Sequence, residues 1–162
     1  MQIKRKAGVS AKLNNIIREI NSTSFRVGWG EGIKYEDGTP VAMIAAQNEF
    51  GNSAKRIPPR PFMRPTISKN RITWTKKTVQ GLNAVLQGNR NTADVMDMMG
   101  QLVAGDVRKA ISKVTQPALK TATVQARLRG KKQGGSVSLT VAKPLVDTGY
   151  MLNSLQSEVI KK

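Results

Sequence analysis

Residues 65–114 encode the pair of helices that decides the fold: PTISKNRITWTKKTVQGLNAVLQGNRNTADVMDMMGQLVAGDVRKAISKV. Apolar residues recur at three- and four-residue intervals on both sides of Gly88-Asn89-Arg90-Asn91, which is the spacing of an amphipathic helix. Pro65 suits the first turn of a helix that reaches to about Gln87. Thr92 can cap a second helix that ends near Val114. The stretch therefore predicts two long helices joined by a short turn.

Shorter elements precede this pair. The apolar spacing of residues 10–20 predicts an amphipathic helix capped by Ser10, and the alternation in residues 25–29 predicts a strand. Residues 41–50 predict a further helix that Gly51 ends. Residues 1–9 precede these elements and are expected to form a flexible basic arm.

The C-terminal third predicts less regular structure. Residues 119–129 suit a short basic helix, and residues 130–143 are expected to form a mobile loop or hairpin. Residues 152–160 suit a helix, a strand, or one after the other. The whole chain, 1–162, is thus expected to be a single α+β domain. It would contain a long central helix pair, a short N-terminal helix and a small mixed or antiparallel sheet.

The composition narrows the range of functions. The chain has 27 Lys and Arg, 10 Asp and Glu, and no His or Cys, so its net charge is +17. Without His and Cys there is no imidazole or thiolate metal site, no disulfide, and no Ser-His or Cys-His catalytic pair. We therefore expect a protein that is not an enzyme and that binds no cofactor and no metal.

Membrane insertion and secretion are also not expected. The longest uninterrupted apolar run, 41–46, is far shorter than the roughly 20 residues that span a bilayer. The basic start, residues 1–6, is followed by amphipathic sequence and not by the apolar core of a secretory signal.

The positive charge lies mainly in two blocks that contain no acidic residue. Residues 50–93 and 107–146 together hold 18 of the 27 basic residues. One interpretation is a surface for the phosphates of DNA or RNA. The other is a basic face that meets an acidic protein partner. Charge alone does not separate the two.

The string Leu145-Val146-Asp147-Thr148-Gly149 is similar to the active-site turn of retroviral-type aspartic proteases. Those enzymes pair two aspartates across a dimer and need a substantial β-barrel around them. Here Tyr150 follows the glycine, and only 12 residues come after Tyr150. We therefore interpret Asp147, Thr148 and Gly149 as a structural turn, in which Asp147 caps the next residues and Gly149 supplies backbone freedom.

Three segments, in this order, resemble the tail-completion and virion-morphogenesis families of tailed bacteriophages. These families include minor tail protein Z-like proteins, tail terminators and head-to-tail joining proteins. The segments are VAMIAAQNEFG at 41–51, IPPRPFMRP at 57–65 and KPLVDTGYMLNSL at 143–155. The sequence departs from the family pattern at 134–141, which lengthens the connection before the third segment.

The resemblance implies a structural protein of the virion neck or the proximal end of the tail. Such a protein would form a ring, expected to be hexameric, that completes or terminates the tail and joins it to the head connector. Its partners would be further copies of itself, the tail tube and the connector or neck proteins, with incidental contact to genomic DNA. It would lie in the virion, and in the host cytoplasm during assembly.

The resemblance also indicates which residues would form the assembly interface. A stiff proline-rich segment loses little conformational entropy when a neighbour binds it, and basic residues suit acidic partners. The expected interface residues are Ile57, Pro58, Pro59, Arg60, Pro61, Phe62, Arg64, Arg127, Arg129, Lys131 and Lys132. The alternative function is that of a basic nucleic-acid-binding or packaging protein.

Overall fold

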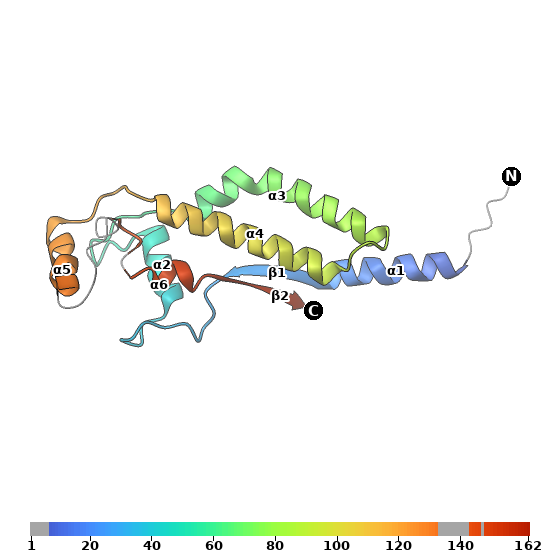
Figure 1. Cartoon of the computed structure of the whole chain (residues 1–162), viewed down its shortest axis with the longest axis horizontal. Helices are drawn as coiled ribbons and strands as arrows, with labels where there is room; N and C mark the ends of the chain where they lie inside the picture. The colour runs from blue at the N-terminus through green and yellow to red at the C-terminus, as the bar shows by residue number, and fades with distance from the viewer. Residues whose placement is uncertain (1–6, 133–142, 147) are drawn as a thin grey trace. The chain divides into compact units, whose positions relative to one another are not determined.

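The computed structural model describes residues 7–132, 143–146 and 148–162. The elements follow the chain in the order α1 (Ala7–Ser22), β1 (Thr23–Gly28), α2 (Val41–Phe50), α3 (Met63–Leu86), α4 (Thr92–Lys113), α5 (Thr121–Lys132), α6 (Tyr150–Asn153) and β2 (Gln156–Lys161). The long helices α3 and α4 lie side by side, and β1 pairs with β2 in a small antiparallel sheet (Figure 1). The α+β class and the central helix pair that we expected are confirmed.

The chain divides into two compact units that interleave along the sequence. We call the first the sheet unit; it contains Met1–Val27, Asn70–Val103 and Ser157–Lys162. We call the second the cavity unit; it contains Gly28–Lys69 and Ala104–Gln156. Both α3 and α4 begin in one unit and end in the other. The organisation of residues 1–162 as a single domain stays a prediction.

Close contact between helices and strands builds the sheet unit. A Cβ atom on Gly81 of α3 would lie 2.5 Å from a methyl carbon of Val95 on α4, so the two helices touch where glycine removes the side chain. Gly100 of α4 has the same role toward the sheet, because a Cβ there would lie 2.9 Å from Ser157 Cβ. In the sheet itself, Arg26 pairs with Glu158 at 2.8 Å across the strands.

The core of the cavity unit comes from segments far apart in the sequence. Phe62 is 2% exposed and makes an edge-on contact with Trp29, whose indole N–H donates to the carbonyl of Met151 at 2.8 Å. Arg108 of α4 donates to the carbonyl of Leu155. The other buried apolar side chains of this unit are Val41, Ala45, Ala104, Val107, Ile111, Leu145, Met151 and Leu155.

Several element boundaries differ from the expected ones. α1 begins at Ala7, so Ser10 is not its cap and residues 7–9 are helical and not part of a flexible arm; residues 1–6 lie outside the described residues. No proline interrupts residues 7–10, so the helix can extend to Ala7 although Gly8, Val9 and Ser10 are weaker helix formers than alanine. Likewise residues 130–132 are the last turn of α5 and not part of a mobile loop, while 133–142 lie outside the described range.

Other boundaries agree with the sequence. α2 spans the expected residues 41–50, and the C-terminal segment forms helix α6 followed by strand β2. Gly149 has a φ of +78°, which confirms the expected backbone freedom at this turn. Thr148 Oγ1 accepts a hydrogen bond from the N–H of Tyr150 at 3.2 Å. The capping role expected for Asp147 lies outside the described residues.

Candidate functional site

The carboxylate of Glu49 joins α2 to the start of α3. It accepts hydrogen bonds from the backbone N–H groups of Phe62, Met63 and Arg64 at 2.7, 2.8 and 3.0 Å. These groups lie at the N-terminus of α3, where N–H groups have no partner within the helix. The Glu49 residue is only 4% exposed. A buried anion is thus held against the positive end of a helix dipole.

This arrangement sets the protonation of Glu49. Burial raises the pKa of its carboxyl, but the N–H groups of Met63, Arg64 and Phe62 and the Arg64 side chain lower it by more. The pKa of Glu49 therefore lies below its ordinary value, because the hydrogen bonds favour the charged form. Glu49 is a permanent negative charge at neutral pH.

The loop between α2 and α3 is fixed by further contacts. Gly51 adopts a φ of +79°, and a Cβ there would lie 3.0 Å from the carbonyl oxygen of Ile57. Asn52 and Ile57 exchange backbone hydrogen bonds at 2.8 and 2.9 Å. The carbonyl of Asn48 accepts from the N–H of Arg60 at 2.6 Å. The proline-rich stretch is therefore held to Asn52 at Ile57 and to α2 at Arg60.

Two arginines join segments within the cavity unit: Arg60 holds the proline-rich stretch, and Arg127 holds α5. Arg60 donates from Nε to the carbonyl of Pro117 at 2.8 Å and from Nη2 to that of Ala118 at 3.2 Å. Arg127 of α5 donates to the carbonyl of Lys143 at 2.9 Å. Burial, and next the positive charge of Arg127, lower the pKa of Arg60 from its ordinary value. The positive charges of Arg60 and Arg127 therefore repel each other.

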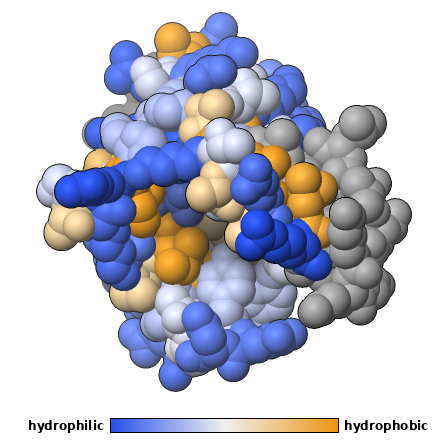
Figure 2. All heavy atoms as spheres, turned by 90° about the vertical axis from the view of Figure 1, so that its left-hand side faces the viewer, coloured by the Kyte–Doolittle hydropathy of each residue, from blue (hydrophilic) through white to orange (hydrophobic). Residues whose placement is uncertain are grey.

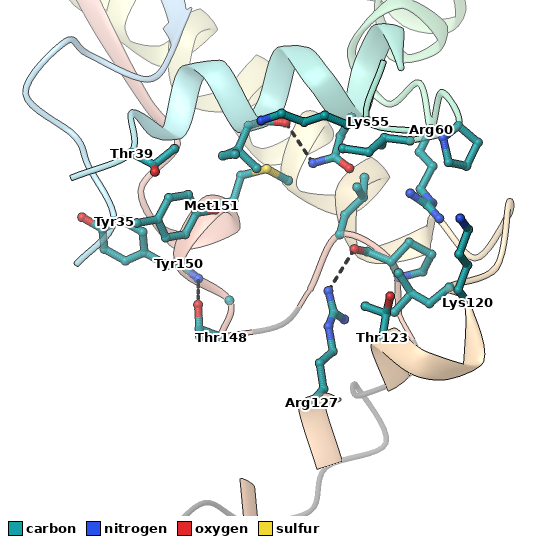
Figure 3. Close-up of a pocket in the computed structure, with 18 of the residues that line it drawn as sticks. Tyr35, Thr39, Lys55, Arg60, Lys120, Thr123, Arg127, Thr148, Tyr150 and Met151 are labelled. Carbon is teal, nitrogen blue, oxygen red and sulfur yellow. Dashed lines mark hydrogen bonds between the residues drawn. The ribbon is translucent and has the colours of Figure 1, made fainter. Parts of the chain in front are cut away.

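A cavity of about 630 Å³ lies beside these arginines, within the cavity unit (Figure 3). Its walls come from α2, the proline-rich stretch, the start of α5 and the turn before α6. The described residues that line it are Tyr35, Asp37, Thr39, Ile44, Asn48, Lys55, Arg56, Ile57, Pro58, Arg60, Leu119, Lys120, Thr123, Arg127, Pro144, Leu145, Thr148, Gly149, Tyr150 and Met151. The volume is in the range of ordinary ligand pockets.

The lining is basic, with apolar patches. Five of the described lining residues are cationic, namely Lys55, Arg56, Arg60, Lys120 and Arg127, and Asp37 is the one acidic residue among them. Figure 3 shows Arg60 and Lys120 on one side and Tyr35, Thr39 and Tyr150 on the other. Figure 2 shows that hydrophobic residues lie between hydrophilic ones on the face that carries α5.

The acid at this cavity is already engaged. Asp37 Oδ1 accepts the N–H of Thr39 at 2.9 Å, which fixes the turn around Gly38. Hydrogen bonding to Thr39 lowers the pKa of Asp37, so its carboxylate stays charged. The ring of Tyr35 packs on Tyr150 with the centroids 5.4 Å apart. This aromatic pair lies at the end of the cavity away from Arg60.

The expected site residues separate into two groups. Ile57, Pro58, Arg60, Arg127, Thr148 and Gly149 meet at the cavity, although they lie in three distant parts of the sequence. Pro59, Pro61, Phe62, Arg64 and Arg129 are not among its lining residues. Lys131 and Lys132 are the last residues of α5, and Asp147 lies outside the described residues.

Two of the expected interface residues are internal. Arg60 is 6% and Phe62 is 2% exposed, because one is hydrogen-bonded to carbonyls of the same unit and the other packs on Trp29. Arg60 meets solvent only at the cavity, and Phe62 has almost no exposed surface, so an interface through these two residues stays a prediction. Pro59, Pro61 and Arg129 are exposed, and an interface through them stays a prediction.

Sequence reasoning missed the central role of Glu49 and the presence of Lys55 and Lys120 at one cavity. The signal for Glu49 was present: an acid followed by Phe50-Gly51 stands next to a proline-rich helix start that needs an acceptor. No sequence signal places Lys55 near Lys120, because 64 intervening residues fold back to bring them together.

Among the described residues, no helix is long and apolar enough to cross a bilayer. Within the same part of the chain, no three His, Cys, Asp or Glu side chains come together as metal ligands. No protein-family model, no curated protein and no solved structure matches this chain.

Proposed function

We propose that this chain is a structural virion protein of a tailed bacteriophage, located at the neck or the head-proximal end of the tail. Several copies would form a ring that completes or terminates the tail and joins it to the head connector. The protein would be present in the host cytoplasm during assembly and in the virion afterwards. This proposal rests on the three segments that resemble tail-completion proteins.

One structural observation supports the proposal most directly. The three segments, 41–51, 57–65 and 143–155, lie in one unit and line one cavity, with Ile44, Arg60 and Leu145 as examples from each. Their convergence supports the view that they belong to one functional feature.

Exposed apolar side chains support self-association. On α3, Ile72, Val79 and Leu86 are 64%, 51% and 45% exposed. They stand seven residues apart, so they fall on one face of the helix. Apolar residues aligned in this way mark protein–protein contacts more often than free surface. In a closed ring, two different patches of each subunit meet, and this stripe is suited to be one of them.

Labelling on purified particles tests the proposal. An antibody to this chain is expected to bind the phage at the junction of head and tail, and the purified chain is expected to form rings in electron micrographs. The variant Ile72→Ser with Val79→Ser is expected to weaken ring formation while α3 stays folded. Label inside the head, or its absence from virions, would contradict the proposal.

One observation favours nucleic-acid binding as a second candidate function. The cavity gathers cations from both acid-free blocks: Lys55, Arg56 and Arg60 from the first, Lys120 and Arg127 from the second. Phosphate binding would make the affinity fall steeply with salt. Measuring the binding of labelled DNA as a function of salt concentration distinguishes this candidate from the ring protein.

A further inference from the structure

Arg60 places a buried cation at the wall of the cavity. Only 6% of the Arg60 surface is exposed. Its guanidinium donates to two neutral carbonyl groups, those of Pro117 and Ala118. Among the described residues no carboxylate forms an ion pair with Arg60. Burying a charge without a counter-charge is unfavourable, and an anion that enters the cavity removes that penalty.

Other positive charges at the cavity also favour the binding of an anion. Lys55, Arg56 and Lys120 line the same cavity, and all three are exposed to solvent. Asp37, at the other end, is the one acid among the described lining residues and is engaged by Thr39. Charges of one sign in a concave site reinforce one another and attract a ligand of opposite sign.

We propose that this cavity binds an acidic peptide segment of another protein. Its carboxylates would lie at the Arg60–Lys120 side, and an apolar side chain would pack against the apolar residues of the walls. This binding site goes beyond the ring itself: it would hold a partner whether or not the chain forms a ring. The partner is recognised by chemistry, as an exposed stretch of Asp and Glu that contains one or two apolar residues.

The apolar lining favours a peptide over a nucleic acid. Ile44, Leu119, Leu145 and Met151 contribute to the walls, together with Pro58. A nucleic-acid backbone meets polar and charged surfaces and its bases stack mainly on aromatic rings, whereas these wall residues are not aromatic. A peptide provides both carboxylates and apolar side chains. The walls also enclose a local pocket, whereas a strand of DNA is followed by a continuous basic groove.

Fluorescence anisotropy with the full chain tests the inference. The probe is a labelled peptide of about eight residues, made of Glu and Asp with one Phe and one Leu, at about 50 mM and about 300 mM salt. A second peptide, with Gln and Asn in place of the acids, tests charge. A labelled oligodeoxythymidine of similar charge tests nucleic acid. We expect the acidic peptide to bind most tightly and the neutral peptide to bind at least about tenfold more weakly.

Variants assign the binding to the cavity. Lys55→Glu with Lys120→Glu reverses two exposed charges of the lining without touching the bonds of Arg60, and an acid at residue 120 suits the start of α5. We expect this double variant to lower the affinity for the acidic peptide at least about tenfold. The matched control, Arg71→Glu with Lys76→Glu on exposed α3 positions, makes the same charge change away from the cavity. It is expected to alter the affinity by less than about twofold.

Three results would overturn the inference. The first is absence of binding by the acidic peptide at low salt. The second is an equal loss of affinity for the acidic peptide in the cavity variant and in the α3 control. That result would mean that the peptide binds elsewhere or without a specific site. The third is tighter binding of the oligodeoxythymidine, lost in the cavity variant, which would make the cavity a nucleic-acid site. None of these results bears on ring formation, so failure here is distinct from failure of the ring proposal.

Discussion

The two long helices begin in opposite ways. At the start of α4, Asn91 Oδ1 accepts the N–H of Asp94 at 2.8 Å, and the Asn91 amide donates to the Asp94 carboxylate at 2.6 Å. At the start of α3, the acceptor is the buried carboxylate of Glu49, which belongs to the preceding helix. One cap is local and exposed, and the other is distant and buried.

The difference has a structural consequence. The cap of α4 stabilises that helix alone, because all its atoms lie within one turn. The cap of α3 also fixes the end of α2 and the proline-rich stretch between them, since Glu49 reaches Phe62 only when residues 51–61 are folded back. Cap and loop are therefore one cooperative feature, and the cavity wall depends on it.

Loss of the Glu49 carboxylate is expected to have the largest effect. Glu49→Ala leaves one buried and two part-buried N–H groups without an acceptor and removes the carboxylate partner of Arg64 Nε, so the free energy of unfolding should fall by about 3 kcal/mol. Urea denaturation followed by circular dichroism measures the change. Glu158→Ala removes an exposed acid from the pair with Arg26 and should cost no more than about 0.5 kcal/mol. Equal losses in the two variants would show that Glu49 is not a special cap.

The buried cap of α3 should also make the stability depend on pH in the acid range. Because the pKa of folded Glu49 is lowered from its ordinary value of 4.5, its contribution to stability is complete above that value and is lost as the pH falls through the folded pKa. Glu49→Gln cannot be protonated and should flatten this part of the stability profile. Unfolding midpoints measured between about pH 6 and pH 3 test this. Parallel profiles for Glu49→Gln and the unmodified chain would refute it.

The local cap is expected to contribute less. Asn91→Ala removes the acceptor for the N–H of Asp94 and should cost about 1 kcal/mol, the usual value for an N-cap. Asn89→Ala, in the same turn, changes a side chain that bonds only to the exposed Gln87 and serves as the control. Comparing the two by urea denaturation isolates the cap. A loss in Asn89→Ala as large as in Asn91→Ala would assign the effect to the turn as a whole.

Local features of the fold were predictable from the sequence. The bounds of α2 and the long helix pair followed from apolar spacing and from Gly51, Pro65 and the 88–91 break, because each signal acts within a few residues. The cap of α4 was predicted one residue late: Thr92 is fully buried, and Asn91 caps the helix instead. Neighbouring polar residues compete for this role, and burial, which sequence does not display, decides between them.

The site was predictable only in part. The proline-rich segment was expected to form an assembly interface and the turn before α6 to be structural; Ile57, Pro58 and Arg60 of the segment and Thr148 and Gly149 of the turn line the cavity. Their meeting with Lys55 and Lys120 was not predicted, because contacts across 60 or more residues depend on packing and not on spacing. For the same reason Arg60 was expected at the surface: proline-rich segments are usually exposed, and nothing local indicates the two carbonyls that hold it.

The smallest expected effect is that of Arg64, and it shows how much the ion pair with Glu49 contributes to the cap of α3. Arg64 donates to Glu49 at 3.0 Å and lies 4.7 Å above the ring of exposed Phe50, but its side chain is 59% exposed. Water therefore screens its charge, and Arg64→Met should cost only about 0.5 kcal/mol, since the backbone N–H groups continue to hold the carboxylate. Urea denaturation of Arg64→Met, Glu49→Ala and the double variant measures the coupling between them. We expect the double variant to be only slightly less stable than Glu49→Ala, because Nη2 of Arg64 also donates to the backbone carbonyl of Glu49 at 3.0 Å and only the double variant loses that bond. A loss from Arg64→Met as large as that from Glu49→Ala would mean that the ion pair, and not the helix N-terminus, holds α2 and α3 together.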